Sequence, residues 1–184
     1  MILDATAGNR TMWRHKSVPG IIYIDIERYL RCKPTIFADN TCTPFHDNNF
    51  NTIFYDPPHA WYGAEHRRRK RGDTTHTNTY DMRNPRKTYY GWDKYQSKGG
   101  LMGHIYKAQI EFSRILKGGG LLWLKWNEFR IPLKQVLKLF TNWTVLMILY
   151  IKSPTQTAGK HQTFWVCMQK KEGTVNQRAL ESFL

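Results

Sequence analysis

The sequence has no long hydrophobic run and only three cysteines, and both absences exclude classes of protein. No apolar run reaches the roughly 18 residues of a membrane-spanning helix, so no membrane partner is predicted. Cys32, Cys42 and Cys167 are an odd number without metal-like spacing, which predicts a reducing compartment and no metal site. Met1 is not followed by the basic and apolar regions of a signal peptide, so a cytoplasmic location is expected (the host cytoplasm for a phage protein).

Acidic residues are also scarce. There are 14 Asp and Glu residues against 28 Lys and Arg residues, which gives a formal net charge of +14. A field of this sign favours polyanions, of which nucleic acid is the commonest. A basic solubilising surface, or a binding face for an acidic protein, would give the same balance. We take nucleic acid as the preferred interpretation.

The basic charge is concentrated in residues 60–100, with ten basic against four acidic residues, a net +6. Seven aromatic residues are interleaved with these charges. Cations that hold phosphates and flat rings that stack on bases are the two parts of a surface for single-stranded nucleic acid or an extruded base. Because no helical or strand periodicity runs through the segment, we interpret it as an irregular insertion. The candidate substrate-binding residues here are Trp61, Arg67, Arg68, Arg69, Lys70 and Arg71.

Outside this insertion, strand-like and helix-like segments alternate. Strands are predicted at 1–4, 21–25, 35–39, 51–56, 121–126, 145–151 and 163–168, and helices at 9–16, 27–31, 101–116 and 132–140. This alternation is typical of an open, mostly parallel sheet with helices on both faces, an α/β fold. We expect a single domain over residues 1–170 and a peripheral tail over residues 171–184.

The stretch YDPPHA, residues 55–60, ends one of these strands with two prolines. Proline has a fixed φ and no N–H, so the strand stops at Asp56 and the chain leaves in a stiff turn. A carboxylate at the carboxyl end of a strand is where an open α/β sheet places its chemistry. A strand-ending turn in which Asp56 merely accepts from local amides would have the same sequence, and these residues alone do not decide between the two.

Aspartates follow four predicted strands in succession, namely Asp4, Asp25, Asp39 and Asp56. Parallel strands place their carboxyl ends at one edge of the sheet, so the four carboxylates should gather there. The turn over residues 4–9 is built of small residues, which permits close approach of a ligand, but its single glycine makes a weak phosphate loop. A carboxylate after the second strand suits ribose hydroxyls, and one after the third suits an adenine amino group. The pattern predicts a cofactor that contains an adenosine.

These residues together resemble the class I S-adenosylmethionine-dependent methyltransferases. The motifs that carry the resemblance are Asp4–Arg10 (DATAGNR), Asp25, Asp39, Asp56–His59 (DPPH) and Lys125–Glu128 (KWNE). Within that family, D-P-P followed by an aromatic residue is similar to the motif of enzymes that methylate an exocyclic amine of a base. The nearest likeness is to small bacterial and phage proteins with D-P-P-H. The resemblance spans residues 1 to about 170.

The resemblance implies a Rossmann-like class I methyltransferase fold, with a seven-stranded sheet whose last strand is antiparallel. It implies S-adenosylmethionine as cofactor and S-adenosylhomocysteine as product. The implied cofactor-binding residues are Asp4, Ala5, Thr6, Ala7, Gly8, Asn9, Arg10, Asp25, Ile26, Asp39 and Asn40. The implied catalytic residues are Asp56, Pro57, Pro58 and His59, with Asp56 and the carbonyl after it accepting hydrogen bonds from the target NH2. Lys125 and Asn127 would border the substrate mouth.

Two features leave the substrate open at this stage. His59 stands where the family usually has Tyr, and no dedicated target-recognition domain fits into the chain. The expected activity is methylation of adenine N6 in DNA, with cytosine a weaker choice. The alternatives are the same chemistry on RNA, a non-catalytic nucleic-acid-binding subunit of a methyltransferase complex, and a small-molecule methyltransferase. The sequence does not decide whether the chain forms a homo- or hetero-oligomer.

Overall fold

The computed structural model describes residues 1–61, 95–151 and 162–171 of the 184-residue chain. Most of the predicted insertion, including Arg67, Arg68, Arg69, Lys70 and Arg71, therefore lies outside the described residues, as does almost all of the predicted tail. No helix in the described part is both long and apolar enough to cross a membrane.

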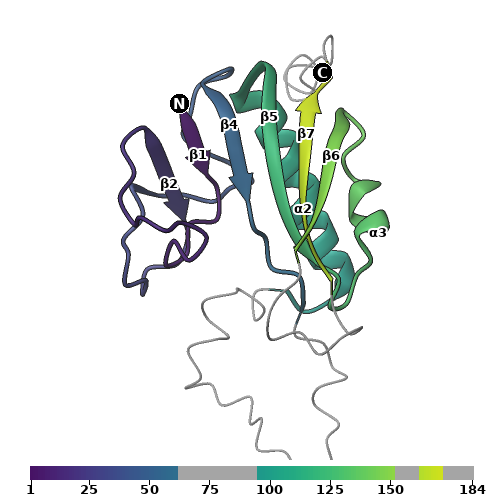
Figure 1. The fold of residues 1–184 in the computed structure, drawn as a ribbon. Coiled ribbons are helices and arrows are strands. Elements are labelled where there is room, and N and C mark those ends of the chain that lie inside the picture. The colour runs from purple at the N-terminus through teal and green to yellow at the C-terminus, as the bar shows by residue number, and fades with distance from the viewer. Residues whose placement is uncertain (62–94, 152–161, 172–184) are drawn as a thin grey trace, which may run out of the picture.

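Seven strands form one sheet in the order β3-β2-β1-β4-β5-β7-β6 (Figure 1). They are β1 (Ile2–Asp4), β2 (Ile21–Asp25), β3 (Ile36–Phe37), β4 (Phe50–Tyr55), β5 (Leu116–Asn127), β6 (Trp143–Ile151) and β7 (Thr163–Lys170). β7 runs antiparallel to both of its neighbours, and the other six strands are parallel to one another. The predicted seven-stranded, mostly parallel sheet with an antiparallel last strand is confirmed. The strand order reverses between β1 and β4, which is the topological switch point where α/β sheets bind ligands.

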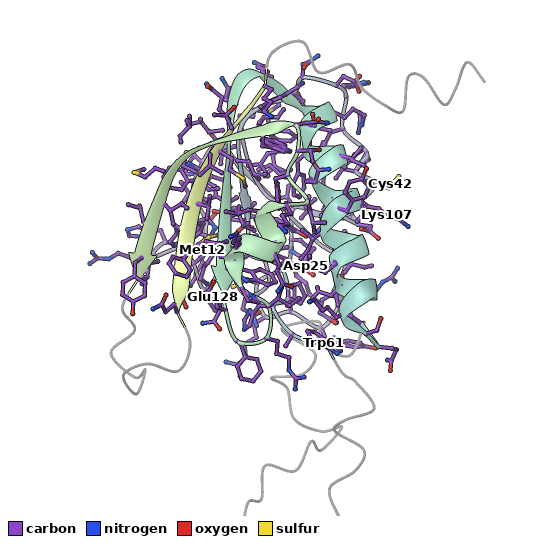
Figure 2. The ribbon with its side chains drawn as sticks, turned by 90° about the vertical axis from the view of Figure 1, so that its right-hand side faces the viewer. Met12, Asp25, Cys42, Trp61, Lys107 and Glu128 are labelled. Carbon is purple, nitrogen blue, oxygen red and sulfur yellow. The ribbon has the colours of Figure 1, made fainter. Side chains whose placement is uncertain are left out.

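Helix α2 (Lys98–Ile115) covers one face of the sheet. Its apolar residues recur at helical spacing, and Leu101, Ile105 and Phe112 are fully buried against the strands. The helix begins three residues earlier than predicted because Ser97 caps it, its side chain accepting a hydrogen bond from the N–H of Gly100. The short helix α3 (Leu133–Leu137) contributes to the same core and lies on the α2 side of the sheet (Figure 2).

Three local predictions were wrong: two of the predicted helices are absent, and the strand after α2 begins earlier than predicted. Residues 9–16 and 27–31 form turns and bends instead of helices, and Arg10 has a φ of 53°, which a right-handed helix does not allow. The glycine run after α2 belongs to β5, which begins at Leu116 directly after the helix. Only glycine fits at position 120, because a Cβ there would lie 2.6 Å from Cγ of Leu116.

The sheet has a filled core on the helix side and an aromatic cluster on the other. On the helix side Ile53, Leu122 and Trp126 are fully buried. On the opposite side, the ring of Phe54 lies 5.1 Å from Trp13 and 6.0 Å from Trp165 between centroids. The partial exposure of this second layer sets it apart from the core under α2.

A buried ion pair fastens the loop before β4 to α2. Glu111 accepts hydrogen bonds from the N–H and the hydroxyl of Thr43, at 2.8 and 2.7 Å, and is paired with Arg114 at 2.6 Å. Burial would raise the pKa of Glu111, but the hydrogen bonds from Arg114 and Thr43 outweigh it and lower that pKa. The ionised carboxylate is therefore part of the folded structure.

Replacement of Glu111 by Gln is expected to lower the free energy of unfolding by about 2 kcal/mol, because Arg114 and Thr43 lose a charged acceptor in a buried site. Urea denaturation measures the change. The control is Asp47→Asn, which removes the exposed partner of the same Arg114 and should cost less than about 0.5 kcal/mol. Equal losses in the two variants would contradict the assignment of the stabilisation to burial.

Candidate functional site

The carboxyl ends of β1, β2 and β4 bring three of the four strand-end aspartates together. Asp4 is the last residue of β1, Asp25 is the last residue of β2, and Asp56 directly follows β4. The charges of Asp25 and Asp56 both act on the carboxyl group of Asp4, as expected of neighbours at one sheet edge. Asp39 follows β3 by two residues. Its carboxylate caps its own loop by accepting hydrogen bonds from the N–H and the hydroxyl of Thr41.

The turn after β1 crosses the switch point and is bonded to both neighbouring strands. The N–H of Ala5 donates to the carbonyl of Phe54 in β4, and the N–H of Ala7 donates to the carbonyl of Ile24 in β2. Gly8, with a φ of 49°, then donates its N–H to Oδ2 of Asp25 at 2.8 Å. These bonds hold the turn over residues 4–8, called the cradle below, in one conformation. Its small residues permit a ligand to approach the backbone closely.

Asp4, the first residue of the cradle, is fully buried. Its pKa is raised from 3.8 to about 6, chiefly by burial, and the charges of Asp56 and Asp25 add to the rise. Hydrogen bonds from the indole N–H of Trp13, at 2.7 Å, and from the N–H of Thr6, at 3.2 Å, oppose it. Asp4 makes no ion pair within the described residues, so its charged form would gain from a ligand with a positive charge.

Asn9 and Arg10, which the resemblance implied as cofactor residues, make structural contacts in the described part. Oδ1 of Asn9 accepts from the N–H groups of Arg31 and Cys32. The guanidinium of Arg10 lies 3.9 Å from the ring centroid of Tyr23 and donates to the carbonyls of Lys16 and Lys33. Both residues thereby tie together the loops that flank β2.

A second group of polar atoms lies beside the cradle, around Asp39. Asn40 donates to the carbonyl of Ala5 at 3.1 Å, while its buried Oδ1 has no partner among the described residues. The buried hydroxyl of Tyr55 is likewise unpartnered there. Burial and the charge of Asp39 raise the pKa values of Tyr55 and Tyr95, so both phenols stay neutral. Unpaired buried donors and acceptors are costly, which marks this group as a place for a polar ligand.

Asp56 is fixed at the edge by two contacts. Its N–H donates to the hydroxyl of Thr6 at 2.7 Å, and its Oδ2 is paired with the ammonium of Lys125 at 2.6 Å. Within the described residues Oδ1 of Asp56 accepts no hydrogen bond. The side chain of Asp56 is 23% exposed, so part of it is accessible to a ligand.

The residues after Asp56 divide into buried and partly exposed positions. Pro57 and Ala60 are buried, whereas Pro58 and His59 are partly exposed. The ring of His59 meets Trp126 edge-on at 6.4 Å, which positions it near the end of β5.

Trp61 lies close to an arginine and a phenylalanine in the loop after β5. The guanidinium carbon of Arg130 lies 5.2 Å from the ring centroid of Trp61 and 5.6 Å from that of Phe129. Figure 2 shows Trp61 and Glu128 in the lower half of the molecule, although Trp61 lies beyond the end of β4 and Glu128 directly follows β5. Arg130 and Phe129 were missed by the sequence analysis, since a single basic residue after a strand carries no distinctive pattern.

The other predicted site residues divide between these groups. Lys125 contacts Asp56 directly. Asn127 instead donates to the hydroxyl of Thr163, which joins β5 to β7, and Ile26 is an exposed side chain after β2. Trp13 bonds to Asp4, and the charge of Asp39 acts on Tyr95. Tyr95 was not assigned from sequence, because one tyrosine among seven aromatic residues carries no distinctive pattern. The described part contains no group of three metal-ligating side chains.

Comparison with solved structures shows the fold. The chain superposes on a type 11 methyltransferase from Sulfolobus solfataricus with a TM-score of 0.51 and 16% identity, covering 95% of this chain and 87% of that one. It superposes on the N-methyltransferase NodS from Bradyrhizobium japonicum WM9 with a TM-score of 0.54 and 13% identity, covering 93% and 84%. It also superposes on the [4+2]-cyclase SpnF with a TM-score of 0.55 and 13% identity, covering 94% and 74%.

No protein-family model and no curated protein matches the sequence. At these identities the similarity establishes the Rossmann-like methyltransferase fold and nothing finer. Because one of these neighbours is a cyclase, the activity has to be argued from the site itself.

Proposed function

We propose that this chain is an S-adenosylmethionine-dependent methyltransferase that acts on an exocyclic amine of a nucleic-acid base, with N6 of adenine in DNA as the target. The observation that carries the proposal is the partly exposed Asp56 carboxylate at the switch point. It is paired with Lys125, the N–H of Asp56 donates to Thr6, and its charge acts on the buried Asp4. The fold of methyltransferases, one of them an N-methyltransferase, supports it.

The polar groups of the site fit this cofactor. S-adenosylmethionine supplies a methyl group activated by a positively charged sulfur, and it also carries an ammonium group. Asp4, with its raised pKa, would face the cationic methionine end. Asp25 already accepts two backbone N–H groups and, since a carboxylate has about four lone-pair sites, can still accept from ribose hydroxyls. Oδ1 of Asn40 would accept from the adenine amino group. The N-methyltransferase NodS has been solved with S-adenosylhomocysteine.

Asp56 would orient the target amine. Its Oδ1 and the carbonyl of Pro57 can accept the two hydrogens of an NH2 group, which directs the nitrogen lone pair toward the methyl group. The ion pair with Lys125 limits the rotation of the carboxylate. The contribution of the protein is then mainly positioning, which is sufficient because the leaving group is already activated. Partly exposed His59 would lie against the extruded base.

The basic charge supports a nucleic-acid substrate. The formal charge of +14 attracts polyanions, and Arg130 with Trp61 and Phe129 offers a cation and two rings. The arginines and lysine at 67–71 would extend this surface. Since the recognition surface is basic and irregular, we expect weak sequence preference and strong dependence on salt.

The first test is calorimetric binding of S-adenosylmethionine to the purified chain. We expect binding that Asp25→Ala weakens at least about tenfold, because one charged hydrogen-bonding group is worth more than about 1.4 kcal/mol. Glu27→Ala, in the same loop, is the matched control and should bind as the unaltered chain does. Thermal unfolding of both variants checks that the loop remains folded. Absence of binding by the unaltered chain would overturn the proposal.

The substrate is then identified by transfer of a labelled methyl group to single- and double-stranded DNA and to RNA of the same sequence. We expect N6-methyladenine in digests of the DNA. Label only in RNA would move the substrate to RNA. Binding of cofactor without any transfer to nucleic acid would leave the binding site in place and overturn the nucleic-acid assignment.

A further inference from the structure

The edge strand β6 exposes an uncommonly long run of apolar side chains. From Val145 to Ile151 every side chain is apolar or aromatic, and all seven are between 37% and 55% exposed. A half-buried strand normally alternates between the two environments, one face to the core and one to water. Here both faces of the strand are exposed and apolar. Seven consecutive exposed apolar side chains are more than the scattered single ones normal on a protein surface, and such clusters mark interaction sites.

The backbone of β6 is open as well. β6 is the last strand of the sheet and pairs with β7 only. Among the described residues, Met147–Ile151 make no backbone hydrogen bond other than those of the pairing with β7. Figure 1 shows β6 at one side of the sheet, with α3, which precedes it in the chain, drawn beside it. An edge of this kind is a template for pairing with another strand.

Local geometry restricts where such pairing can occur. The register with β7 shifts between Val145 and Met147, which indicates a β-bulge at Leu146. Bulges interrupt an edge and hinder pairing there. From Met147 to Ile151 the register is unbroken, so these five residues form the regular part of the edge.

Charge identifies the occupant. Each chain carries +14, so two copies repel each other over most of their surfaces. No charged residue occurs between Leu139 and Ile151, which makes β6 the place where two copies can approach without a charge penalty. An acidic protein or a nucleic acid would gain nothing from this uncharged strand. An antiparallel strand pair is also compatible with two-fold symmetry, since each residue then meets its counterpart reciprocally.

We propose that the outer edge of β6 is a homodimer interface, at which residues Met147–Ile151 pair antiparallel with the same residues of a second copy. The two sheets then form one continuous sheet across both chains. Because the two-fold axis reverses the strand direction, the carboxyl edges of the two sheets face opposite ways, and each chain keeps its own site. The inference does not depend on the proposed function.

The test is the mass of the purified, nuclease-treated chain in solution, measured by light scattering over a wide range of concentration. We expect a species of twice 21.8 kDa. Leu149→Lys places like charges at the centre of the paired segment and should give the monomer. The matched control is Phe37→Lys on β3, the opposite edge strand, where the side chain is 51% exposed, and it should stay dimeric. Circular dichroism shows that both variants are folded.

Salt provides a second readout. Screening reduces the repulsion between two chains of the same sign, so added salt should strengthen dimerisation. Association bridged by residual nucleic acid would weaken instead. A monomer at every concentration and salt level would overturn the proposal, as would a Leu149→Lys variant that dimerises like the unaltered chain.

Discussion

Replacement of Asp56 by Ala is expected to reduce the rate of methyl transfer about a thousandfold, the scale seen when one preorganised polar group is removed from a reacting centre. The variant loses the acceptor that fixes the target amine, and Lys125 loses its partner. The affinity for S-adenosylmethionine should change less than about threefold, because the cofactor contacts proposed here come from the loops after β1, β2 and β3.

Single-turnover kinetics with labelled cofactor measure this effect separately from binding. Asp56→Asn is the informative companion, since it keeps the shape and one oxygen acceptor but not the charge, and an intermediate rate is expected. Asp47→Ala, which removes an exposed carboxylate paired with Arg114, controls for the general loss of a negative charge. If Asp56→Ala transferred methyl groups at the rate of the unaltered chain, Asp56 would be no more than a strand-ending turn residue.

Acidification below about pH 6 is expected to weaken binding of S-adenosylmethionine, by close to tenfold per pH unit. The physical reason is the raised pKa of Asp4, about 6, which means that the carboxyl group is neutral below this pH and no longer attracts the cationic end of the cofactor. At about pH 4 the affinity should be roughly a hundredfold lower than at neutral pH. Asp4 is the group near the cradle whose pKa is raised into this range.

The free energy of unfolding should respond to Asp4 in the opposite sense. Its pKa is higher in the folded chain than the value of 3.8 for a free side chain, so the folded state binds the proton more tightly. Stability from this group is therefore fully present below about pH 4 and is lost as the pH rises through about 6. The loss amounts to about 3 kcal/mol, because the folded and unfolded pKa values of Asp4 differ by about 2 and each pKa unit corresponds to about 1.36 kcal/mol.

Asp4→Asn separates these two effects. It removes the titrating group, so both the decline in affinity below about pH 6 and the matching decline in stability above it should disappear. Calorimetry of cofactor binding and urea denaturation across the pH range measure the two quantities. A variant that retained the same pH profile would show that another group is responsible.

The sequence by itself determined the sheet and the residues at its edge. Strands such as 21–25 were predictable because a short run of β-branched and aromatic residues has few other stable arrangements. The two prolines after Asp56 fixed where β4 ends, and the succession of aspartates at strand ends placed the candidate site at the switch point. These are local rules of backbone geometry, and they act wherever the residues occur.

Only the tertiary structure decided which side chains work together. The ion pair of Lys125 with Asp56, the hydrogen bond of Trp13 to Asp4 and the stacking of Arg10 on Tyr23 join residues from different elements. The raised pKa of Asp4 likewise depends on its burial, which no local pattern reports. Short helices at 9–16 and 27–31 were mispredicted because side-chain contacts of Arg10 and Asn9 fix those loops. Propensity is a property of a segment, whereas burial and partner choice exist only once the segments have packed.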